Sequence, residues 1–231
     1  MSIAAAVDGL VCEAGGLRLR APPFDFMAGD IAVFEPQGGA AEGEFAAAIA
    51  RVLATVAFPL AGTLALFGEA VAARGYVDLL RTRHRIGLVQ GRGGLLSNRT
   101  LRDNIALPIA THGKLDARAE AARVQALLAE FQLERVAALR PHEVDGTTRF
   151  RTCAARAVAL GPTWLVVEGV GDFEASSGLS ATWRSLVGRA SAGECALAAC
   201  LSRPNGALTA VLCEVGAHVY GCVAEASGGT A

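Results

Sequence analysis

The 231-residue sequence predicts a single α/β domain built around a mostly parallel sheet. Short apolar runs with strand character recur along the chain, at residues 31–35, 63–67, 86–90, 164–168 and 196–201. Helical stretches separate these runs, and a glycine-bearing loop joins the first run to an alanine-rich segment. Because parallel strands need crossover connections, this alternation predicts a sheet covered by helices.

Four longer stretches predict the covering helices: residues 45–57, 117–131, 147–160 and 177–190. In the second stretch, the apolar residues lie at i, i+3, i+4 and i+7, and they are Val124, Leu127, Leu128 and Phe131. This stripe favours core packing over a cofactor site. Thr100 and Asp103 have the spacing of a capping box, and we expect their short helix to end near Pro108.

Composition excludes some functions and restricts others. The 21 basic and 22 acidic residues give a net charge of −1, which argues against a nucleic-acid-binding surface. Hydrophobic residues make up 52% of the chain, but no uninterrupted apolar run is long enough for a transmembrane helix and no secretory leader is evident. We therefore expect a cytoplasmic protein with extra apolar surface for partners.

The six cysteines form no C-x-x-C pair, which favours reduced, buried thiols. The one spacing that resembles a set of metal ligands combines Cys213, His218 and Cys222. We expect no metal there, because the stretch has strand character and the spacing fits no common zinc motif.

Residues 29–45, GDIAVFEPQGGAAEGEF, keep the frame of a phosphate-binding Walker A motif, G-x-x-x-x-G-K-[ST], but lose its chemistry. Aligned without gaps, the motif positions fall on Pro36, Gly39, Ala41, Glu42 and Gly43. The lysine is thus replaced by Glu42, and the hydroxyl that binds Mg²⁺ by Gly43. A unit-charge pair at ~4 Å is worth about 4 kcal/mol at an effective dielectric of about 20, so this reversal of charge is severe. An ordinary strand–helix junction with chance spacing is the alternative.

Glu42 and Glu44 fall in the expected first turn of the helix that follows, where carboxylates interact favourably with the macrodipole. The chain therefore supplies its own anions at the helix end where a P-loop binds phosphate.

Four further segments follow in a fixed order: PLAGTLALFG (59–68), RIGLVQGRGGLLSNRTLRDNIALPI (85–109), PHEVDGTTRFRTCAARAVALGP (141–162) and WLVVEGV (164–170). Together with the Walker A frame, they resemble the ATP-binding subunits of ABC transporters over residues 29–224. The resemblance implies a P-loop NTPase (RecA-like) core with a β subdomain and a helical subdomain inserted at roughly 92–160. The GGLLSNRTLRDNIALP stretch is most similar to the branch that powers MCE-type lipid transporters (maintenance of lipid asymmetry), and related export and cell-division branches stay open.

The positions that the family uses for nucleotide chemistry have changed in this chain. The Q-loop glutamine position falls on Gly91, and Gln90 lies one residue earlier. The Walker B aspartate becomes Glu168, and the catalytic glutamate becomes Gly169. The signature LSGG is replaced by Val144, Asp145, Gly146 and Thr147.

Two further family positions have no counterpart. The D-loop aspartate falls on Ala175, and the switch histidine is missing, with Arg203 or Cys200 nearest. Phosphoryl transfer needs these groups together, so the resemblance implies a pseudo-ATPase that binds neither ATP nor Mg²⁺.

A weakly active or altered ATPase is the alternative, with Glu168 on metal and Asp172 or Glu174 orienting water. A binding module unrelated to transport is the third hypothesis. Under the first, we expect the chain to bind a membrane permease, with an intact ATP-binding subunit as a further partner. It would then lie peripherally on the cytoplasmic side of the inner membrane. The expected docking residues are Leu95, Leu96 and Asn98, and Leu95→Asp or Leu96→Asp should release the chain from its complex without unfolding it.

Overall fold

The computed structural model describes residues 3–14, 17–37, 42–91, 93–113, 115–170 and 180–226. Its strands are β1 (Ile3–Ala14), β2 (Leu17–Arg20), β3 (Phe24–Met27), β4 (Ile31–Gln37), β5 (Ala61–Leu66), β6 (Glu69–Ala70), β7 (Ile86–Val89), β8 (Trp164–Val170), β9 (Ala196–Leu201) and β10 (His218–Ala226). Its α-helices are α1 (Glu42–Leu53), α2 (Tyr76–Arg83), α3 (Leu101–His112), α4 (Ala117–Glu130), α5 (Gly146–Ala157), α6 (Ala181–Ser191) and α7 (Gly206–Glu214). Short 3₁₀ turns lie at Val71–Ala73, Glu134–Val136 and Pro141–Glu143.

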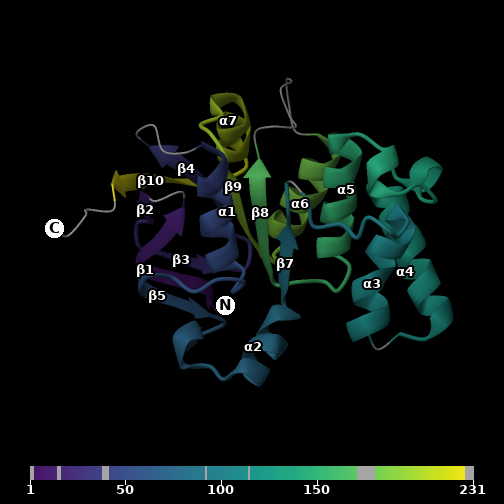
Figure 1. Cartoon of the computed structure of the whole chain (residues 1–231), viewed down its shortest axis with the longest axis horizontal. Helices are drawn as coiled ribbons and strands as arrows, with labels where there is room; N and C mark the ends of the chain where they lie inside the picture. Colours follow the sequence, from purple (N-terminus) through teal and green to yellow (C-terminus); the bar gives the residue numbers. More distant parts are fainter. Residues whose placement is uncertain are drawn as a thin grey trace.

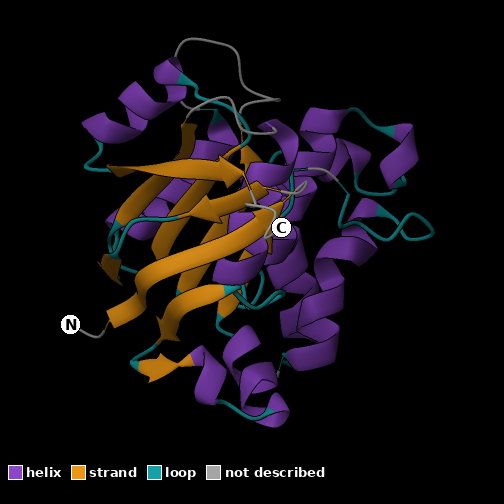
Figure 2. Cartoon of the chain, turned by 60° about the vertical axis from the view of Figure 1, so that its left-hand side comes forward, coloured by secondary structure: helices purple, strands orange, loops and turns teal. Residues whose placement is uncertain are grey.

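One curved sheet runs through the molecule, with helices on its faces and at one end (Figures 1 and 2). Its strand order is β6-β5-β1-β2-β10-β4-β9-β8-β7, and β3 pairs with β1. The strands β10, β4, β9, β8 and β7 pair in parallel. The strands β1, β2, β3, β5 and β6 pair antiparallel and form the other half of the sheet.

The expected strands at 31–35, 63–67, 86–90, 164–168 and 196–201 are confirmed as β4, β5, β7, β8 and β9. The expectation of a mostly parallel sheet was too strong, since among the described strands half are antiparallel. The first 27 residues account for most of the difference. Alanine and glycine dilute the alternation of β1, so its strand character shows only through its pairing with three neighbours.

The central parallel strands are buried on both faces, as expected when helices cover both sides. In β8, Leu165 and Val167 belong to a core shared with α3 to α6. Trp164 and Val166 face the opposite way, into a core shared with α1 and the antiparallel strands. The Trp164 indole N–H donates to the Leu53 carbonyl at 2.9 Å, which ties β8 to the end of α1.

The helices α3, α4 and α5 gather at one end of the sheet, beyond β7 (Figure 1). The expected apolar stripe of α4 is confirmed, because Val124, Leu127 and Leu128 are buried. The Thr100 capping box is also confirmed: Thr100 Oγ1 accepts from the Asp103 N–H at 3.1 Å. The division of the chain at residues 92–160 stays a prediction.

The prediction that the helix after Thr100 ends near Pro108 was wrong. The helix α3 continues through Pro108 to His112. Proline removes one backbone N–H, but the following turn still buries Ile109 in the core, and this burial outweighs the loss. The helix α6 begins at Ala181, after a Ser180 cap, so the predicted start at residue 177 lies outside the described residues. Among the helices that the structure describes, none is long and apolar enough to cross a membrane.

Candidate functional site

The strand–loop–helix frame is present between β4 and α1. Pro36 is buried near the end of β4, in register with Cys222 of β10. The helix α1 starts with Glu42 and Gly43, whose side chains lie outside the described residues, as do Gly39 and Ala41 altogether. The described strand and helix therefore flank the position of a phosphate-binding loop, and the helix begins with one acidic and one small residue.

Glu168 lies near the end of β8, beside Cys200 of β9. Its residue surface is only 9% exposed, and within the described parts of the chain Oε2 is buried without a hydrogen-bond partner. Burial raises the pKa of the Glu168 carboxyl, and the charge of Arg51 opposes this shift. The carboxyl therefore favours its neutral form more than an exposed glutamate does, which is unfavourable for holding a cation.

The backbone is irregular at Gly169, the position that corresponds to the catalytic glutamate. Gly169 has φ +73°, and the register between β8 and β9 shifts between Glu168 and Val170. A side chain at Gly169 would be strained, because residues with a Cβ rarely adopt this conformation.

At the adjacent Q-loop position, Gly91, close backbone contacts leave no room for a side chain. A Cβ added at Gly91 would lie 2.6 Å from the Glu168 carbonyl oxygen and 3.1 Å from that of Gly169. The two positions that need a functional side chain are thus glycines whose backbones lie against each other. A side chain at Gly91 requires the backbone to move, whereas at Gly169 the obstacle is the positive φ and not the space around the Cβ.

Gln90, one residue earlier, turns toward the following loop. A Cβ added at Gly94 would meet its Oε1 at 2.3 Å, so the glutamine side chain covers Gly94. The helix α5 holds the loop from the other side, because Cys153 Sγ donates to the Gly93 carbonyl at 3.5 Å and the Arg156 guanidinium donates to the Gly94 carbonyl. This segment is fixed by packing contacts.

The residues at the signature position begin α5. Asp145 is the N-cap, and its Oδ1 accepts the Thr148 backbone N–H at 2.6 Å. Gly146 and Thr147 are the first residues of the helix. The pKa of Asp145 is lowered, first by the backbone hydrogen bond from Thr148 and then by that residue's side chain. The chain's own carboxylate therefore occupies the positive end of this helix.

The expected docking residues differ in exposure. Leu96 is 43% exposed and Asn98 is exposed, whereas Leu95 is half-buried and packs against the core shared with α3 to α6. The prediction that Leu95→Asp leaves the fold intact stays a prediction, but the packing of Leu95 makes this position unsuitable for testing docking separately from folding. Leu96 is the suitable position for a test.

Sequence reasoning missed Asn104, which holds this segment. Asn104 is fully buried in α3, and its Oδ1 accepts the Leu96 N–H at 2.7 Å. Its Nδ2 donates to the carbonyls of Leu96, at 3.1 Å, and Thr100, at 2.9 Å. The signal was available, since Asn104 lies beside Leu101 and Ile105 on the apolar face of a predicted helix, where a polar residue needs partners.

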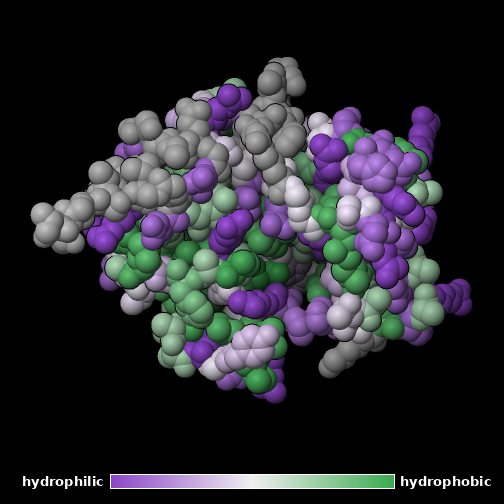
Figure 3. Space-filling view, in the orientation of Figure 1, coloured by the Kyte–Doolittle hydropathy of each residue, from purple (hydrophilic) through white to green (hydrophobic). Residues whose placement is uncertain are grey.

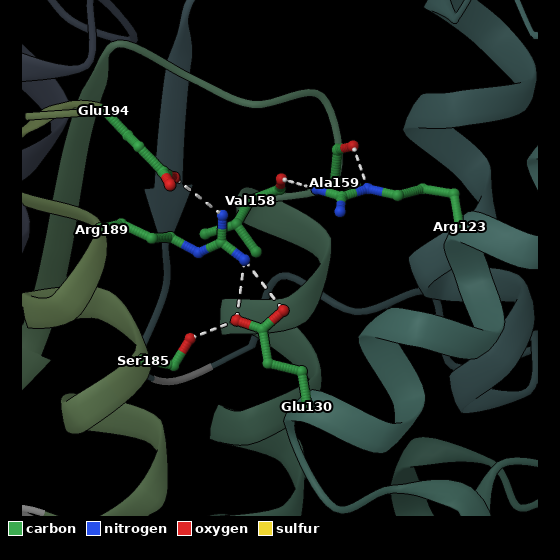
Figure 4. Close-up of polar contacts among 7 residues, drawn as sticks. All are labelled: Arg123, Glu130, Val158, Ala159, Ser185, Arg189 and Glu194. Carbon is green, nitrogen blue, oxygen red and sulfur yellow. Dashed lines mark hydrogen bonds and ion pairs between the residues drawn. The ribbon is translucent and has the colours of Figure 1, made fainter. Parts of the chain in front are cut away.

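An ion pair joins α4 to α6 (Figure 4). Arg189 Nη2 donates to both carboxylate oxygens of Glu130, at 2.7 and 2.9 Å, and Nη1 pairs with Glu194 at 3.3 Å. Ser185 also donates to Glu130. Arg123 of α4 donates to the carbonyls of Val158 and Ala159, which follow α5, at 3.1 and 3.3 Å. Polar contacts therefore join α4 to α6 and to the residues that follow α5, in addition to the contacts of the apolar core.

The residues of the spacing that resembles a set of metal ligands differ in burial. Cys222 is buried whereas Cys213 is exposed, and among the described residues no three histidine, cysteine or acidic groups are placed to hold an ion. Of the positions that the resemblance assigns to a magnesium nucleotide, Gly43 has no hydroxyl, Asp145 caps its own helix, and Glu168 lies buried with a raised pKa.

Two solved structures share the fold of this chain. The chain aligns with a dimeric ATP-binding cassette, MJ0796, bound to ADP and phosphate, at a TM-score of 0.68 with 16% identity, covering 85% of this chain and 87% of the other. It aligns with cbiO1 from Clostridium perfringens, part of the ABC transporter complex cbiONQ, at a TM-score of 0.70 with 13% identity, covering 95% and 85%. The fold is therefore that of an ABC-type ATPase domain.

The sequence comparison points the same way. The methionine import ATP-binding protein MetN 2 of Pseudomonas aeruginosa is 33% identical over 118 residues, which are 51% of this chain and 35% of the relative. No family model matches the chain. The match thus spans about a third of the length of this curated relative. Over these 118 residues, the chain is similar in sequence to a methionine import ATP-binding protein.

Proposed function

We propose that this chain is a catalytically inactive ABC-type subunit that docks on a membrane permease and assembles or regulates the transporter. The contact between Gly91 and the backbone at Glu168 and Gly169 carries the proposal. A side chain at Gly91 would require the backbone to move, and one at Gly169 would be held in a left-handed conformation that side chains rarely adopt. Substitution of single side chains therefore does not rebuild the site.

The electrostatics of the two helix ends also support inactivity. Asp145 already caps α5. The helix α1 begins with Glu42, at the position where the family has the lysine that binds the phosphates. Phosphate would meet carboxylates at both places, and like charges brought together out of water repel strongly.

The docking part of the proposal rests on the segment that begins after Gly91. Asn104 fixes its backbone, and the exposed side chain of Leu96 lies beside the exposed Asn98. A rigid apolar anchor with a polar surround is the usual composition of an interface centre. The structural neighbour cbiO1 is part of a multi-component ABC transporter complex, which supports a comparable assembly for this chain.

For the cargo, we infer lipid transport from the similarity of GGLLSNRTLRDNIALP to the MCE branch. The MetN relatives favour a second candidate, an import system for a small molecule such as an amino acid. Identification of the permease that copurifies with the chain distinguishes the two.

Calorimetric titration with Mg·ATP tests inactivity. The wild-type chain should show no saturable binding at micromolar nucleotide. Glu42→Lys should give at most weak binding and no turnover, because residues that act as a unit are not additive. Saturable micromolar binding by the wild type favours the alternative, a weak or altered ATPase that uses the carboxyl of Glu168.

Affinity copurification from detergent-solubilised membranes tests docking. The wild-type chain should bring down a permease, and Leu96→Asp should lose it. Val215→Asp is the matched control, because Val215 is 42% exposed but follows α7, away from the docking segment. Circular dichroism checks that both variants fold. Retention of the permease by folded Leu96→Asp, or its absence from the wild-type sample, contradicts the docking proposal.

A further inference from the structure

A pocket of about 510 Å³ lies along the side of α1. Its walls come from α1, from the end of β1 and from the segment 57–60 that leads into β5. On α1 the lining runs from Glu44 to Val52, so the pocket follows the side of the helix and is not confined to its N-terminal end. The volume lies within the range of roughly 300–1,000 Å³ that is usual for small-molecule sites.

Backbone hydrogen bonds fix the three walls relative to one another. The Arg51 carbonyl accepts the N–H groups of Val56 at 2.7 Å and of Ala57 at 3.1 Å, which holds the following chain against the end of α1. The Leu60 N–H donates to the Val11 carbonyl at 2.8 Å, and β5 then continues as the antiparallel neighbour of β1. The shape of the pocket is therefore set by the backbone of the fold.

Most of the lining is apolar and consists of Ala47, Ala48, Val52, Ala57, Phe58 and Leu60. Phe58 is 63% exposed and Leu60 is 55% exposed, although both are large apolar side chains. Cys12 adds no charge to the lining, because burial raises the pKa of its thiol to about 12. In Figure 3, hydrophobic and hydrophilic surface lie side by side over the region where Figure 1 places α1 and β5. An apolar ligand body would cover the hydrophobic part.

Three charged side chains line the same pocket: Glu13 from β1, and Glu44 and Arg51 from α1. All three are exposed, and among the ion pairs between described residues none includes any of them. Residues 44 and 51 lie on one face of the helix, two turns apart, with an axial separation of about 10 Å. Ala47 and Ala48 lie between them on this face. The side of the helix thus presents a carboxylate, an apolar stretch and a guanidinium in sequence.

We propose that this pocket binds a linear organic zwitterion, an apolar chain with an ammonium group at one end and a carboxylate at the other. The ammonium group would lie at Glu44, with Glu13 as a second carboxylate. The ligand carboxylate would lie at Arg51, because a planar guanidinium donates two parallel hydrogen bonds to such a group. The apolar middle would cover the helix between them and contact Phe58. The proposal requires neither nucleotide nor permease, since the lining contains no residue of the segment 91–108.

A ligand with a single charge satisfies less of this pocket. An amine leaves the guanidinium of Arg51 without a counterion, and an organic acid meets the carboxylates of Glu13 and Glu44. Arg51 also opposes the rise in the pKa of the buried Glu168, but burial favours the neutral form of that carboxyl and so leaves the guanidinium available. A zwitterion pairs charges of both signs at once.

Amide NMR titration of the full-length protein with 6-aminohexanoate, hexylamine and hexanoate tests the proposal. The zwitterion should bind at one site with a Kd on the order of 1 mM, as expected for a ligand with few heavy atoms. It should shift the amide signals of α1 and of the segment 57–60. Hexylamine and hexanoate should each bind about threefold more weakly or less, the scale of an exposed charge pair. Equal affinities for all three ligands, or shifts confined to residues outside the pocket, overturn the proposal.

Charge variants identify the residues that recognise each end of the ligand. Arg51→Gln should remove the preference for the zwitterion over hexylamine, and the double variant Glu13→Gln/Glu44→Gln should remove the preference over hexanoate. Arg118→Gln and Glu134→Gln change exposed residues outside the pocket and are the matched controls, which should keep both preferences. Circular dichroism checks that the variants fold. An unchanged preference over hexylamine in folded Arg51→Gln, or over hexanoate in the folded double variant, also contradicts the proposal.

Discussion

Two regions of this molecule differ in how their buried polar groups are satisfied. One is the end of β7 and β8 around Gly91, Glu168 and Gly169, here called the nucleotide edge, and the other is the helical end formed by α3, α4 and α5. At the nucleotide edge, Glu168 is buried without a partner for Oε2, and Gly91 leaves room only for backbone. At the helical end, the buried polar side chain of Asn104 has its hydrogen bonds, and Thr100 and Asp116 cap their helices. The fold is therefore stabilised by helix caps and packing, and it does not require phosphate-binding groups.

The largest expected effect tests the helical end. Asn104→Ala should destabilise the protein by about 3 kcal/mol, because the Leu96 amide and several carbonyls lose a buried partner. Urea unfolding measures the loss, and hydrogen exchange should show faster opening at residues 95–100. Asn98→Ala, at an exposed site, is the control and should change stability little. A loss below ~1 kcal/mol would mean that this end is not held as the hydrogen bonds indicate.

The next effect tests whether the nucleotide edge is closed. Gly91→Ala should destabilise by about 2 kcal/mol, since its Cβ would lie 2.6 Å from a backbone oxygen. Gly188→Ala, inside α6 with open space around its Cβ, should instead stabilise by about 0.5–1 kcal/mol through helix propensity. Thermal unfolding of the pair gives the sign directly. A Gly91→Ala protein as stable as wild type would show that the edge can open.

A third effect concerns the buried carboxyl. Because burial raises the folded-state pKa of Glu168 above its ordinary value of 4.5, the stability associated with its neutral form is present below about pH 4.5 and is lost as pH rises through the folded pKa. Glu168→Gln should therefore stabilise the protein at pH 8 by about 1.5 kcal/mol and change little at pH 4. The exposed Glu134→Gln is the control. Destabilisation at pH 8 would indicate that the ionised carboxylate has a partner in the folded state.

The smallest effect concerns the signature helix. Asp145→Ala should cost about 1 kcal/mol through loss of the N-cap, and Asp145→Ser should recover most of it. Since the pKa of Asp145 is lowered, its contribution is present above the unfolded-state pKa and fades as pH falls through the folded-state value. Chemical unfolding at pH 7 and pH 3 measures both. Equal stability of Asp145→Ala and wild type at pH 7 would remove the self-capping argument.

Much of the fold was predictable because its signals are local. The apolar runs of the parallel strands, the stripe on α4 and the Thr100 capping box depend on residues within one or two turns of each other. The strands before residue 28, and helices α2 and α7, were not predicted. Their sequences lack a clear period, and their structure depends on pairing or packing with distant segments.

For the candidate site, the sequence by itself determined which groups are present. It showed acidic or small residues in place of lysine, hydroxyl and catalytic carboxylate, and alignment of the spacing was enough for that. Only the tertiary structure decided what those residues do. Asp145 acts as a cap, Gly91 and Gly169 are in backbone contact, and Leu95 is packing rather than surface.

One groove of the structure has the same origin. Arg83, His112 and Arg156 come from α2, α3 and α5, and His84 follows α2; nothing in their spacing along the chain predicts that they line one groove beside β7. The physical reason is general: a motif is read along the chain, but burial, steric closure and the sign of a local field are sums over neighbours that only folding brings together.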